Sequence, residues 1–537
     1  MARTITGKND ILADLEQRVH DKILERNNFD LLKKLIENAD TLDEAIKIAE
    51  LGTTYKRTGF HFDKRLERTS NTIAYFKKNE ELSFTTDENA LTHKLIIGDN
   101  YPALLNLLIE YRGKIDVIYI DPPYGKDSMG SFAETNYDNA ITRDNLLSML
   151  YPRLYVAKQL LSDSGVIFCS IDDKNHAYVK CLFDEVFEER NFVTEFVWEK
   201  KKKPSFLHRN IGKLNEFILC YTKNCYLSEP FSVETTTLGK KYPFNNAGNG
   251  ISILTFPAKS VRFGFKEGVI EPQDMSNGNI ITELLDRLEV KDGRNMGEFR
   301  LRGEWRYSQS VLDKIVANNE GITISQIPFR PNHIKVGGNI KKMKNTLSPA
   351  HYDMETNEDA TSQLDKILGS DIFENPKPLK LINYLIKATT YYNPEAIVLD
   401  FFAGSGTTGQ AVLELNNADR GEGRRQFILV TNNEITPTTP NGIAKDVTSK
   451  RLKRVMTGTC YDGSSDFEWC KKNAPLGDNL LVLDIAEVSN FEAAKGQTPF
   501  DVIDETLYGN NRFETIREKV EWVCDNFEIT QKRLEEE

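Results

Sequence analysis

The stretch AIVLDFFAGSGTTGQAVLEL, residues 396–415, decides the fold. Apolar residues typical of a buried strand run into a glycine-rich turn, and a helical pattern follows. Asp400 stands where the strand ends, and Gly404 and Gly406 let the backbone turn tightly and approach a ligand. Thr407 can donate its hydroxyl or cap the helix, whose first N–H groups favour a carboxylate or phosphate. Since a single G-x-G is most often only a tight turn, the stretch by itself predicts no more than a strand–turn–helix unit.

Strands and helices alternate on both sides of this unit. Short apolar segments recur from residue 94 onward, and the interval 143–161 has the pattern of an amphipathic helix. Between about 225 and 370 regular helices are scarce, and Gly, Asn, Thr and Pro interrupt the pattern. The sequence therefore predicts one parallel α/β domain with a second domain inserted into it. The expected strands are 94–99, 116–121, 165–173, 216–222, 425–434 and 480–485.

A second stretch, DVIYIDPPYGKDSMG at 116–130, ends a predicted strand with an acid and two prolines. Asp121 closes the strand, so we expect it at the carboxyl edge of the sheet, where open α/β sheets bind ligands. Pro122 and Pro123 fix the backbone and offer no N–H group. The Asp121 carboxylate and the Pro122 carbonyl therefore make a stiff pair of acceptors, suited to an exocyclic amine. Tyr124 can lay its ring on a planar base.

Taken together, the two stretches resemble a known class of enzymes. The D-P-P-Y tetrad matches the D/N/S-P-P-Y/F motif of amino-methylating DNA methyltransferases, whose acid form usually acts on adenine N6 and whose Ser form acts more often on cytosine N4. The pattern D-x-F-x-G-x-G, which includes Phe402, is similar to the S-adenosylmethionine turn of class I methyltransferases. The resemblance implies that Asp121, Pro122, Pro123 and Tyr124 are catalytic and that the target base is flipped out of the duplex.

The order of the two motifs narrows the resemblance. The tetrad precedes the glycine turn by about 280 residues, as in β-class DNA methyltransferases, whereas protein-glutamine methyltransferases place the turn first. The implied fold is a class I, Rossmann-like α/β methyltransferase with circularly permuted motif order, an inserted target-recognition domain and helical N-terminal and mixed C-terminal extensions. The predicted regions are a helical N-terminal region (1–90), the first part of the methyltransferase domain (91–225), the target-recognition domain (226–370), the second part with the cofactor turn (371–455) and a C-terminal interaction or dimerisation domain (456–537).

Further segments resemble those that hold the cofactor in this class. NPKPLKLINYLIKATT at 375–390 resembles the segment that packs on the cofactor's methionine end, and IIGDN at 96–100 resembles the strand end that holds its adenine. The class commonly has an acid after the next strand to bind the ribose. Here FILVTNNE offers Thr431, Asn432 and Asn433 before Glu434, so Glu434 is the expected ligand, and an asparagine could do part of the binding. The implied cofactor residues are Asp99, Lys377, Pro378, Asp400, Phe402, Gly404, Gly406, Thr407 and Glu434.

Two segments resemble the Mod subunit of Type III restriction–modification systems. They are LLSMLYPRLYVAKQLLSDSGVIFCSIDD at 146–173, and FVWEKKKKP followed by NEFILCYTKN within 196–224. That family works on double-stranded DNA as a Mod dimer, with a separate Res subunit that carries helicase and nuclease activity. This sequence shows neither an ATP-binding loop nor a nuclease motif, so we expect it to modify DNA but not to cut it. The alternatives are a solitary regulatory methyltransferase, a cytosine-N4 or RNA target, and a non-catalytic DNA-binding module.

Basic segments suggest where DNA binds. Four lysines in a row lie beside the proposed catalytic domain and favour a phosphate-binding loop over a merely solvated surface. The middle region adds FRLRGEWRYSQS at 299–310, in which Trp305 is more simply a core residue, and HIKVGGNIKKMKN at 333–345. The candidate DNA contacts are Lys200, Lys201, Lys202, Lys203, Arg209, Arg306, Lys341 and Lys342.

Composition limits the other possibilities. The 537 residues are too many for one ordinary domain, and the net charge of −11 excludes a uniformly basic surface but not a local basic groove. Seven cysteines without a CxxC pair or Cys/His ligand spacing predict reduced thiols and no metal site. No apolar run approaches the length of a membrane span, and the N-terminus has no apolar signal core. We therefore expect a cytoplasmic protein.

Overall fold

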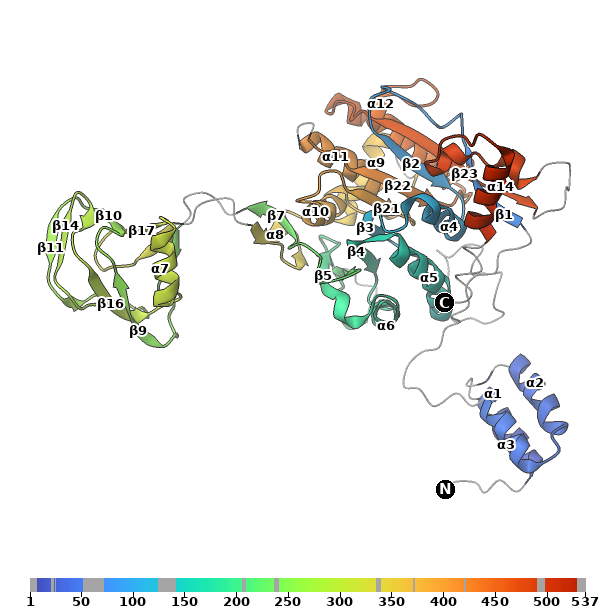
Figure 1. Cartoon of the computed structure of the whole chain (residues 1–537), viewed down its shortest axis with the longest axis horizontal. Coiled ribbons are helices and arrows are strands. Elements are labelled where there is room, and N and C mark those ends of the chain that lie inside the picture. Colours follow the sequence, from blue (N-terminus) through green and yellow to red (C-terminus); the bar gives the residue numbers. More distant parts are fainter. Residues whose placement is uncertain are drawn as a thin grey trace.

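One large mixed sheet dominates the computed structural model (Figure 1). The structure describes residues 7–20, 24, 26–51, 72–123, 142–204, 209–235, 241–334, 340–369, 372–419, 422–489 and 498–528. Within these residues, ten strands form the sheet. In spatial order they are β1 (Thr72–Lys78), β23 (Asn479–Ser489), β2 (Thr92–Ile97), β22 (Gln426–Thr431), β21 (Ile397–Asp400), β3 (Ile115–Ile120), β4 (Leu161–Ile171), β6 (Asn215–Thr222), β5 (Phe192–Glu199) and β20 (Thr346–Leu347).

The centre of the sheet is parallel, from β23 through β2, β22, β21 and β3 to β4. Strand β6 runs antiparallel between β4 and β5, and β1 is antiparallel at the opposite edge. Strand β21 pairs directly with β3, with Leu399 opposite Ile118. Because the two strands are parallel, the glycine turn after Asp400 and the tetrad that begins at Asp121 leave the sheet at the same edge. The predicted α/β fold class is confirmed, and the circular permutation stays a prediction.

Helices cover both faces of the sheet, because alternate side chains of each central strand point to opposite faces. Ile118 and Ile120 of β3 share a core with helices α4, α5, α6 and α14. Val117 and Tyr119 share the opposite core with α9, α10, α11 and α12. The bounds are α4 (Asn100–Tyr111), α5 (Thr142–Leu160), α6 (His176–Phe187), α9 (Asn357–Leu368), α10 (Leu379–Thr389), α11 (Thr407–Ala418), α12 (Lys450–Thr457) and α14 (Ile516–Val523).

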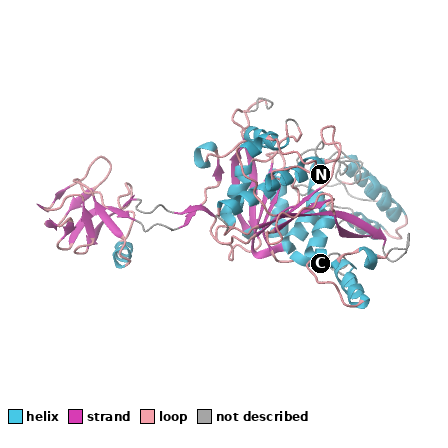
Figure 2. Cartoon of the chain, turned by 90° about the horizontal axis from the view of Figure 1, so that it is seen from above, coloured by secondary structure: helices cyan, strands magenta, loops and turns pink. Residues whose placement is uncertain are grey.

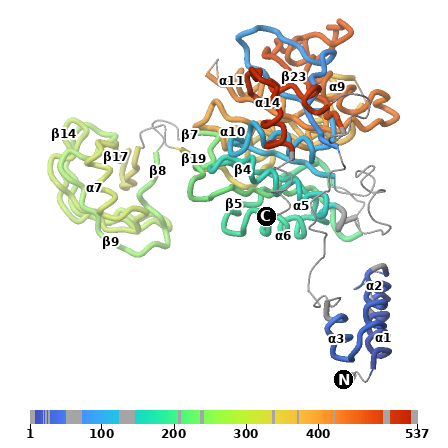
Figure 3. Tube along the Cα trace, turned by 45° about the vertical axis from the view of Figure 1, so that its right-hand side comes forward, coloured from blue at the N-terminus to red at the C-terminus, as the bar shows by residue number. Residues whose placement is uncertain are grey.

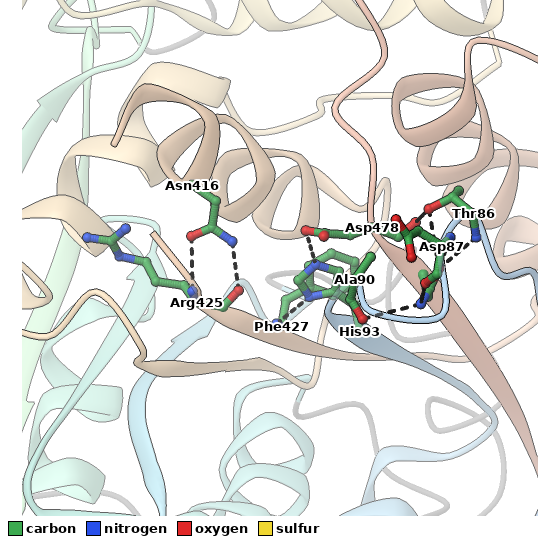
Figure 4. Close-up of polar contacts among 9 residues, drawn as sticks. Thr86, Asp87, Ala90, His93, Asn416, Arg425, Phe427 and Asp478 are labelled. Atoms are coloured by element: carbon green, nitrogen blue, oxygen red, sulfur yellow. Dashed lines mark hydrogen bonds and ion pairs between the residues drawn. The ribbon is translucent and has the colours of Figure 1, made fainter. Parts of the chain in front are cut away.

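The C-terminal part of the chain extends the large sheet, since β23 inserts between β1 and β2. A buried histidine joins the start of this strand to its neighbours (Figure 4). The backbone N–H of Phe427 donates to His93 Nδ1 (3.1 Å), so Nε2 carries the hydrogen and donates to Asp478 Oδ2 (3.1 Å). Burial lowers the pKa of His93 although Asp478 raises it. Part of the segment expected to be a separate interaction domain therefore belongs to the main core.

The middle of the chain forms a body rich in strands, drawn at the left of Figures 1 and 2. Its sheets have the orders β11-β14-β15-β10-β17-β18-β8 and β12-β13-β16-β9, and they enclose their own core. Trp305 is buried in that core and donates to the Ser252 carbonyl (2.9 Å), which confirms its expected core role. The bounds are β8 (Lys241–Pro243), β9 (Ile251–Phe256), β10 (Val261–Phe263), β11 (Gly268–Ile270), β12 (Gln273–Asp274), β13 (Thr282–Leu284), β14 (Leu288–Lys291), β15 (Arg294–Asn295), β16 (Phe299–Glu304), α7 (Gln309–Ala317), β17 (Gly321–Ile324) and β18 (Asn332–Ile334).

The return from the middle body to the large sheet comes earlier in the chain than the expected boundary at residue 370. Strands β7 (Ser232–Thr235) and β19 (Ile340–Lys342) pair with each other, and β20 pairs with β5. The short α8 (Pro349–Tyr352) and then α9 follow, and the apolar residues of α9 lie in the core of the large sheet. The sequence did not predict this boundary, because neither the two residues of β20 nor the amphipathic pattern of α9 indicates which core the element joins.

The N-terminal helices α1 (Lys8–His20), α2 (Arg26–Glu37) and α3 (Leu42–Leu51) pack on one another around Ile11, Leu15 and Ile36 (Figure 3). Among the described residues, no helix is both long enough and apolar enough to cross a lipid bilayer.

Candidate active site

A cavity of about 620 Å³ opens at the carboxyl edge of the parallel strands. Its volume lies within the range of about 300–1,000 Å³ that small-molecule sites occupy. Segments from the ends of β2, β3, β21 and β22 line it, together with the segment before α10. The predicted catalytic and cofactor residues among its lining are Asp99, Asp121, Pro122, Pro123, Lys377, Asp400, Phe402, Gly404, Thr407 and Glu434. Tyr124 lies outside the described residues.

The glycine turn has the backbone shape that its sequence predicts. Gly404 and Gly406 have φ values of 47° and 78°, in the left-handed region that favours glycine. Gly406 is the N-cap of α11, and a Cβ atom there would lie 3.1 Å from Thr448 Cγ2. The Thr448 hydroxyl donates to the Gly404 carbonyl (2.6 Å) and ties the turn to the helical segment Ala444–Ser449, which leads into α12. The turn is therefore held from behind, and its open side faces the cavity.

A buried arginine, which sequence reasoning missed, supports the same turn. Arg451 Nη1 donates to the Thr407 hydroxyl (2.8 Å) and to the Ser405 carbonyl (3.2 Å). The Thr407 hydroxyl in turn donates to the Lys377 carbonyl (3.3 Å). Burial lowers the pKa of Arg451 to about 10, so it remains charged at neutral pH. Thr407 thus connects the glycine turn to the segment before α10.

Asp400 is a buried carboxyl group at the end of β21. The backbone N–H of Phe402 donates to Asp400 Oδ1 (3.0 Å), and the Thr408 hydroxyl donates to Oδ2. Burial raises the pKa of Asp400 to about 7, although these two bonds lower it, and the negative charge of Asp121 adds to the rise. The carboxyl group therefore titrates near neutral pH in the structure.

Asp121 lies at the end of β3 within a group of buried charges. Lys377 Nζ is 2.9 Å from Asp121 Oδ1 and 3.3 Å from Glu216 Oε2, and Lys200 Nζ is 2.8 Å from Glu216 Oε1. Burial opposes the charge of Lys377, but the two carboxylates outweigh it and raise its pKa. The ammonium group of Lys377 thus points to the tetrad. The sequence analysis did not identify Glu216. The one indication was its position as a charged residue in an otherwise apolar strand.

Asp99 occupies the other end of the cavity, at the N-cap of α4. Its carboxylate accepts from the Tyr101 backbone N–H (2.7 Å) and from Arg153 Nη2 (3.1 Å). Asn100 Nδ2 donates to the Phe401 carbonyl (2.8 Å) and ties this strand end to the glycine turn. Arg153 is fully buried and was also missed, because one arginine on an amphipathic helix is normally a surface residue.

The candidate ribose ligands after β22 differ in whether they are available to a ligand. Asn433 Nδ2 donates to the Asn441 carbonyl (2.8 Å), and its Oδ1 accepts from the Lys445 backbone N–H (3.2 Å). Asn432 and Glu434 are exposed and line the cavity. Of the expected acid and its asparagine neighbours, Asn433 is therefore engaged in holding the loop, and Glu434 and Asn432 face the space.

The remaining predicted residues lie near the cavity or away from it. Pro378 is the N-cap of α10. Lys200 lies in the cavity wall, and Lys202 and Lys341 form ion pairs with Asp359 and Glu234. Lys201 is partly buried. The exposed candidates are Lys202, Lys203, Arg209, Arg306, Lys341 and Lys342.

Comparison with known proteins identifies the class of this site. The Mod subunit of the Type III restriction-modification enzyme StyLTI of Salmonella typhimurium is 29% identical over 406 residues, which cover 69% of this chain and 58% of that subunit. The Mod subunit of the Type III enzyme EcoPI of Escherichia phage P1 is 29% identical over 425 residues, with coverages of 69% and 63%. The Type II methyltransferase M.KpnI of Klebsiella pneumoniae is 26% identical over 421 residues, with coverages of 76% and 97%.

The chain thus spans about three fifths of the length of the two Mod subunits. A family model described as an uncharacterised conserved protein matches residues 9–117. The model of the DNA methylase family matches residues 115–431, which contain the tetrad and the glycine turn. Because this match covers more than half of the sequence, the chain belongs to the DNA methylase family.

Proposed function

We propose that the protein transfers a methyl group from S-adenosylmethionine to adenine N6 in double-stranded DNA, as the modification subunit of a Type III system. One observation carries this proposal: Asp121-Pro122-Pro123 and the glycine turn leave adjacent parallel strands and line the same cavity. Similarity to Mod subunits supports the Type III assignment.

The residues of the cavity fit the proposed cofactor. The N-terminus of α11 suits its carboxylate, and Phe402 and the apolar atoms of the cavity wall suit its adenine. Asp99 and Glu434 offer acceptors for polar groups at the cavity's other end. When bound, S-adenosylmethionine supplies an electrophilic methyl group on a positively charged sulfur.

The tetrad supplies the groups that act on the target amine. The adenine amino nitrogen is a weak nucleophile because its lone pair is drawn into the ring. The Asp121 carboxylate and the Pro122 carbonyl would accept hydrogen bonds from its two N–H groups. These bonds would draw the nitrogen toward tetrahedral geometry, which localises the lone pair. Positioning and electrostatic complementarity provide the rate increase, without a covalent enzyme intermediate.

Access to the cavity requires that the target base leave the duplex. Flipping a base costs a few kcal/mol, and a stacking contact with Tyr124 would offset part of that cost. We assign recognition of the DNA sequence to the middle body, whose exposed basic residues include Arg306. We also propose that the protein acts in the cytoplasm, as a homodimer, with a helicase–nuclease Res subunit as partner.

Nucleoside analysis tests the proposal directly. The purified chain, DNA from a host that lacks adenine methylation, and labelled S-adenosylmethionine should yield N6-methyladenine. Asp121→Ala is the matched control, and it should give none while still binding the cofactor. N4-methylcytosine as product, methylated RNA but not DNA, or no methylated base would each contradict the assignment. Long-read sequencing of the product would then give the recognition site.

A further inference from the structure

Buried and partly buried charges at Asp121 form a series of alternating sign. Lys200, Glu216, Lys377 and Asp121 follow one another, with distances of 2.8, 3.3 and 2.9 Å between successive charged atoms. They come from three places in the fold: the paired strands β5 and β6, the segment before α10 and the end of β3. The Glu216 side chain is only 4% exposed and that of Lys377 only 10% exposed.

The central pair, Glu216 and Lys377, is costly to bury, since these two ions lose most of their hydration. On balance Lys377 and Lys200 lower the pKa of Glu216, although burial raises it, so the carboxylate is charged in the folded protein. Sequence arguments place Lys200 on a DNA-binding loop and Lys377 at the cofactor's methionine end, but neither position accounts for an ionised glutamate between their ammonium groups. The last charge of the series is the carboxylate of Asp121, the first residue of the tetrad.

We propose that Lys377 and Glu216 are positioning residues that hold Asp121 as an oriented acceptor for the target amine. This inference rests on the proposed function and deepens it. Lys377 fixes one carboxylate oxygen of Asp121 through a contact of 2.9 Å. Glu216 contacts the same ammonium group (3.3 Å) and limits its pull on Asp121, so the carboxylate keeps acceptor capacity for the amino hydrogens.

Other charged and titratable groups also face Asp121. Asp400 on β21 adds negative charge, and its carboxyl group titrates near pH 7. Tyr119 on β3 and Cys169 on β4 are buried, and burial raises the pKa of each well above its ordinary value, so both stay neutral. Lys377 brings a positive charge into contact with Asp121 (2.9 Å), and its removal takes that charge away while the negative charge of Asp400 remains nearby.

The test compares full-length Lys377→Met, Glu216→Gln and the double variant with the unaltered protein. At saturating cofactor and DNA, the acid limb of the pH–kcat profile should move to higher pH in Lys377→Met and to lower pH in Glu216→Gln. Loss of one preorganised partner should lower kcat at pH 8 by about 10²–10³-fold in Lys377→Met. In the double variant the limb should return at least halfway, because removal of Glu216's charge relieves the repulsion on Asp121.

A binding measurement provides a readout independent of turnover. The target site, once mapped, is prepared with adenine or with purine, which lacks the amine. The preference for adenine should be lost in Lys377→Met at low pH and should reappear when Glu216→Gln is added. Lys94→Met is the matched control, because Lys94 forms an ion pair with Glu110 (2.7 Å) outside the cavity lining. Its pH profile should coincide with that of the unaltered protein.

The outcomes separate this inference from the proposed function. If the unaltered protein methylates no DNA, the proposed function fails. If it methylates DNA but the acid limbs of the variants coincide with its own, only the positioning roles are overturned. An unmoved limb together with weaker cofactor binding in Lys377→Met overturns them as well, and it favours direct contact between Lys377 and the cofactor.

Discussion

Asp400→Asn should stabilise the protein without cofactor at pH 8 and slightly destabilise it at low pH. The pKa of Asp400 rises from 3.8 to about 7 in the folded protein, chiefly because the group is buried. The folded state therefore holds the proton more tightly than the unfolded state does. The stability that this provides is fully present below pH 3.8 and is lost as the pH rises through about 7. An asparagine is neutral throughout this range.

The size of the effect follows from the shift. About three pKa units correspond to about 4 kcal/mol of lost stability at pH 8, at about 1.4 kcal/mol per unit. Asparagine keeps a carbonyl acceptor for the Phe402 N–H, but its amide cannot accept from the Thr408 hydroxyl, which costs about 1 kcal/mol. The variant should therefore be more stable by about 3 kcal/mol at pH 8, and less stable by about 1 kcal/mol near pH 3.

Hydrogen exchange measured by mass spectrometry suits this prediction, because the chain has several cores and need not unfold in two states. The opening free energies of peptides from β21 and α11 are compared between variant and unaltered protein at pH 5 and pH 8. Their difference should change by about 3 kcal/mol, since about two pKa units lie in that interval. Asp466→Asn, at an exposed position, should show no such change. A difference for Asp400→Asn that is equal at both pH values would refute the reasoning.

Three further changes test other parts of the site. Asp121→Ala should lower kcat by at least about 10³-fold and leave the cofactor dissociation constant unchanged, as measured by calorimetry; retained turnover would contradict the catalytic role. Gly404→Val forces a branched residue into the left-handed region beside the Phe373 ring, at a cost of about 1–2 kcal/mol, and should abolish cofactor binding; an unchanged dissociation constant would exclude the turn as the site. Neutralising exposed Lys203 and Arg209 should reduce the slope of log K against log salt by about 0.9 for each DNA phosphate that the protein no longer neutralises, and an unaltered slope would leave them as surface residues.

The sequence predicts the parts of the site that depend on the backbone. The strand, glycines and helix of residues 396–415 follow from periodicity and from conformations that favour glycine, and all three are present. The proximity of Asp121 and Asp400 also follows, because parallel strands end at one edge and the two strands are neighbours. The two residues are far apart in the sequence, but each follows an apolar segment that predicts a strand by itself.

Side chains that act through tertiary contacts were beyond sequence reasoning. Arg153, Glu216 and Arg451 are each a single charged residue in an ordinary strand or helix pattern, and only the packing of several elements brings their partners near. The same limit explains Lys200. In a run of four lysines it is indistinguishable from its neighbours, yet the antiparallel pairing of β5 with β6 brings it within 2.8 Å of Glu216.

The charges at the sheet edge are difficult to explain as stabilising elements. Burial of Asp400 costs stability at the pH where the protein would work, and Glu216 and Lys377 are desolvated to form a pair that apolar side chains could replace. Arg451 adds another buried charge behind the glycine turn. Their common property is that each fixes a group lining one cavity: the carboxylate of Asp121, the turn at Gly404 or the hydroxyl of Thr407. If these charges were merely structural, neutral replacements would raise stability without loss of binding or turnover. We expect the gain in stability of Asp400→Asn at pH 8 to come with weaker binding of the cofactor, because the carboxyl group of Asp400 lines the cavity that we propose as the cofactor site.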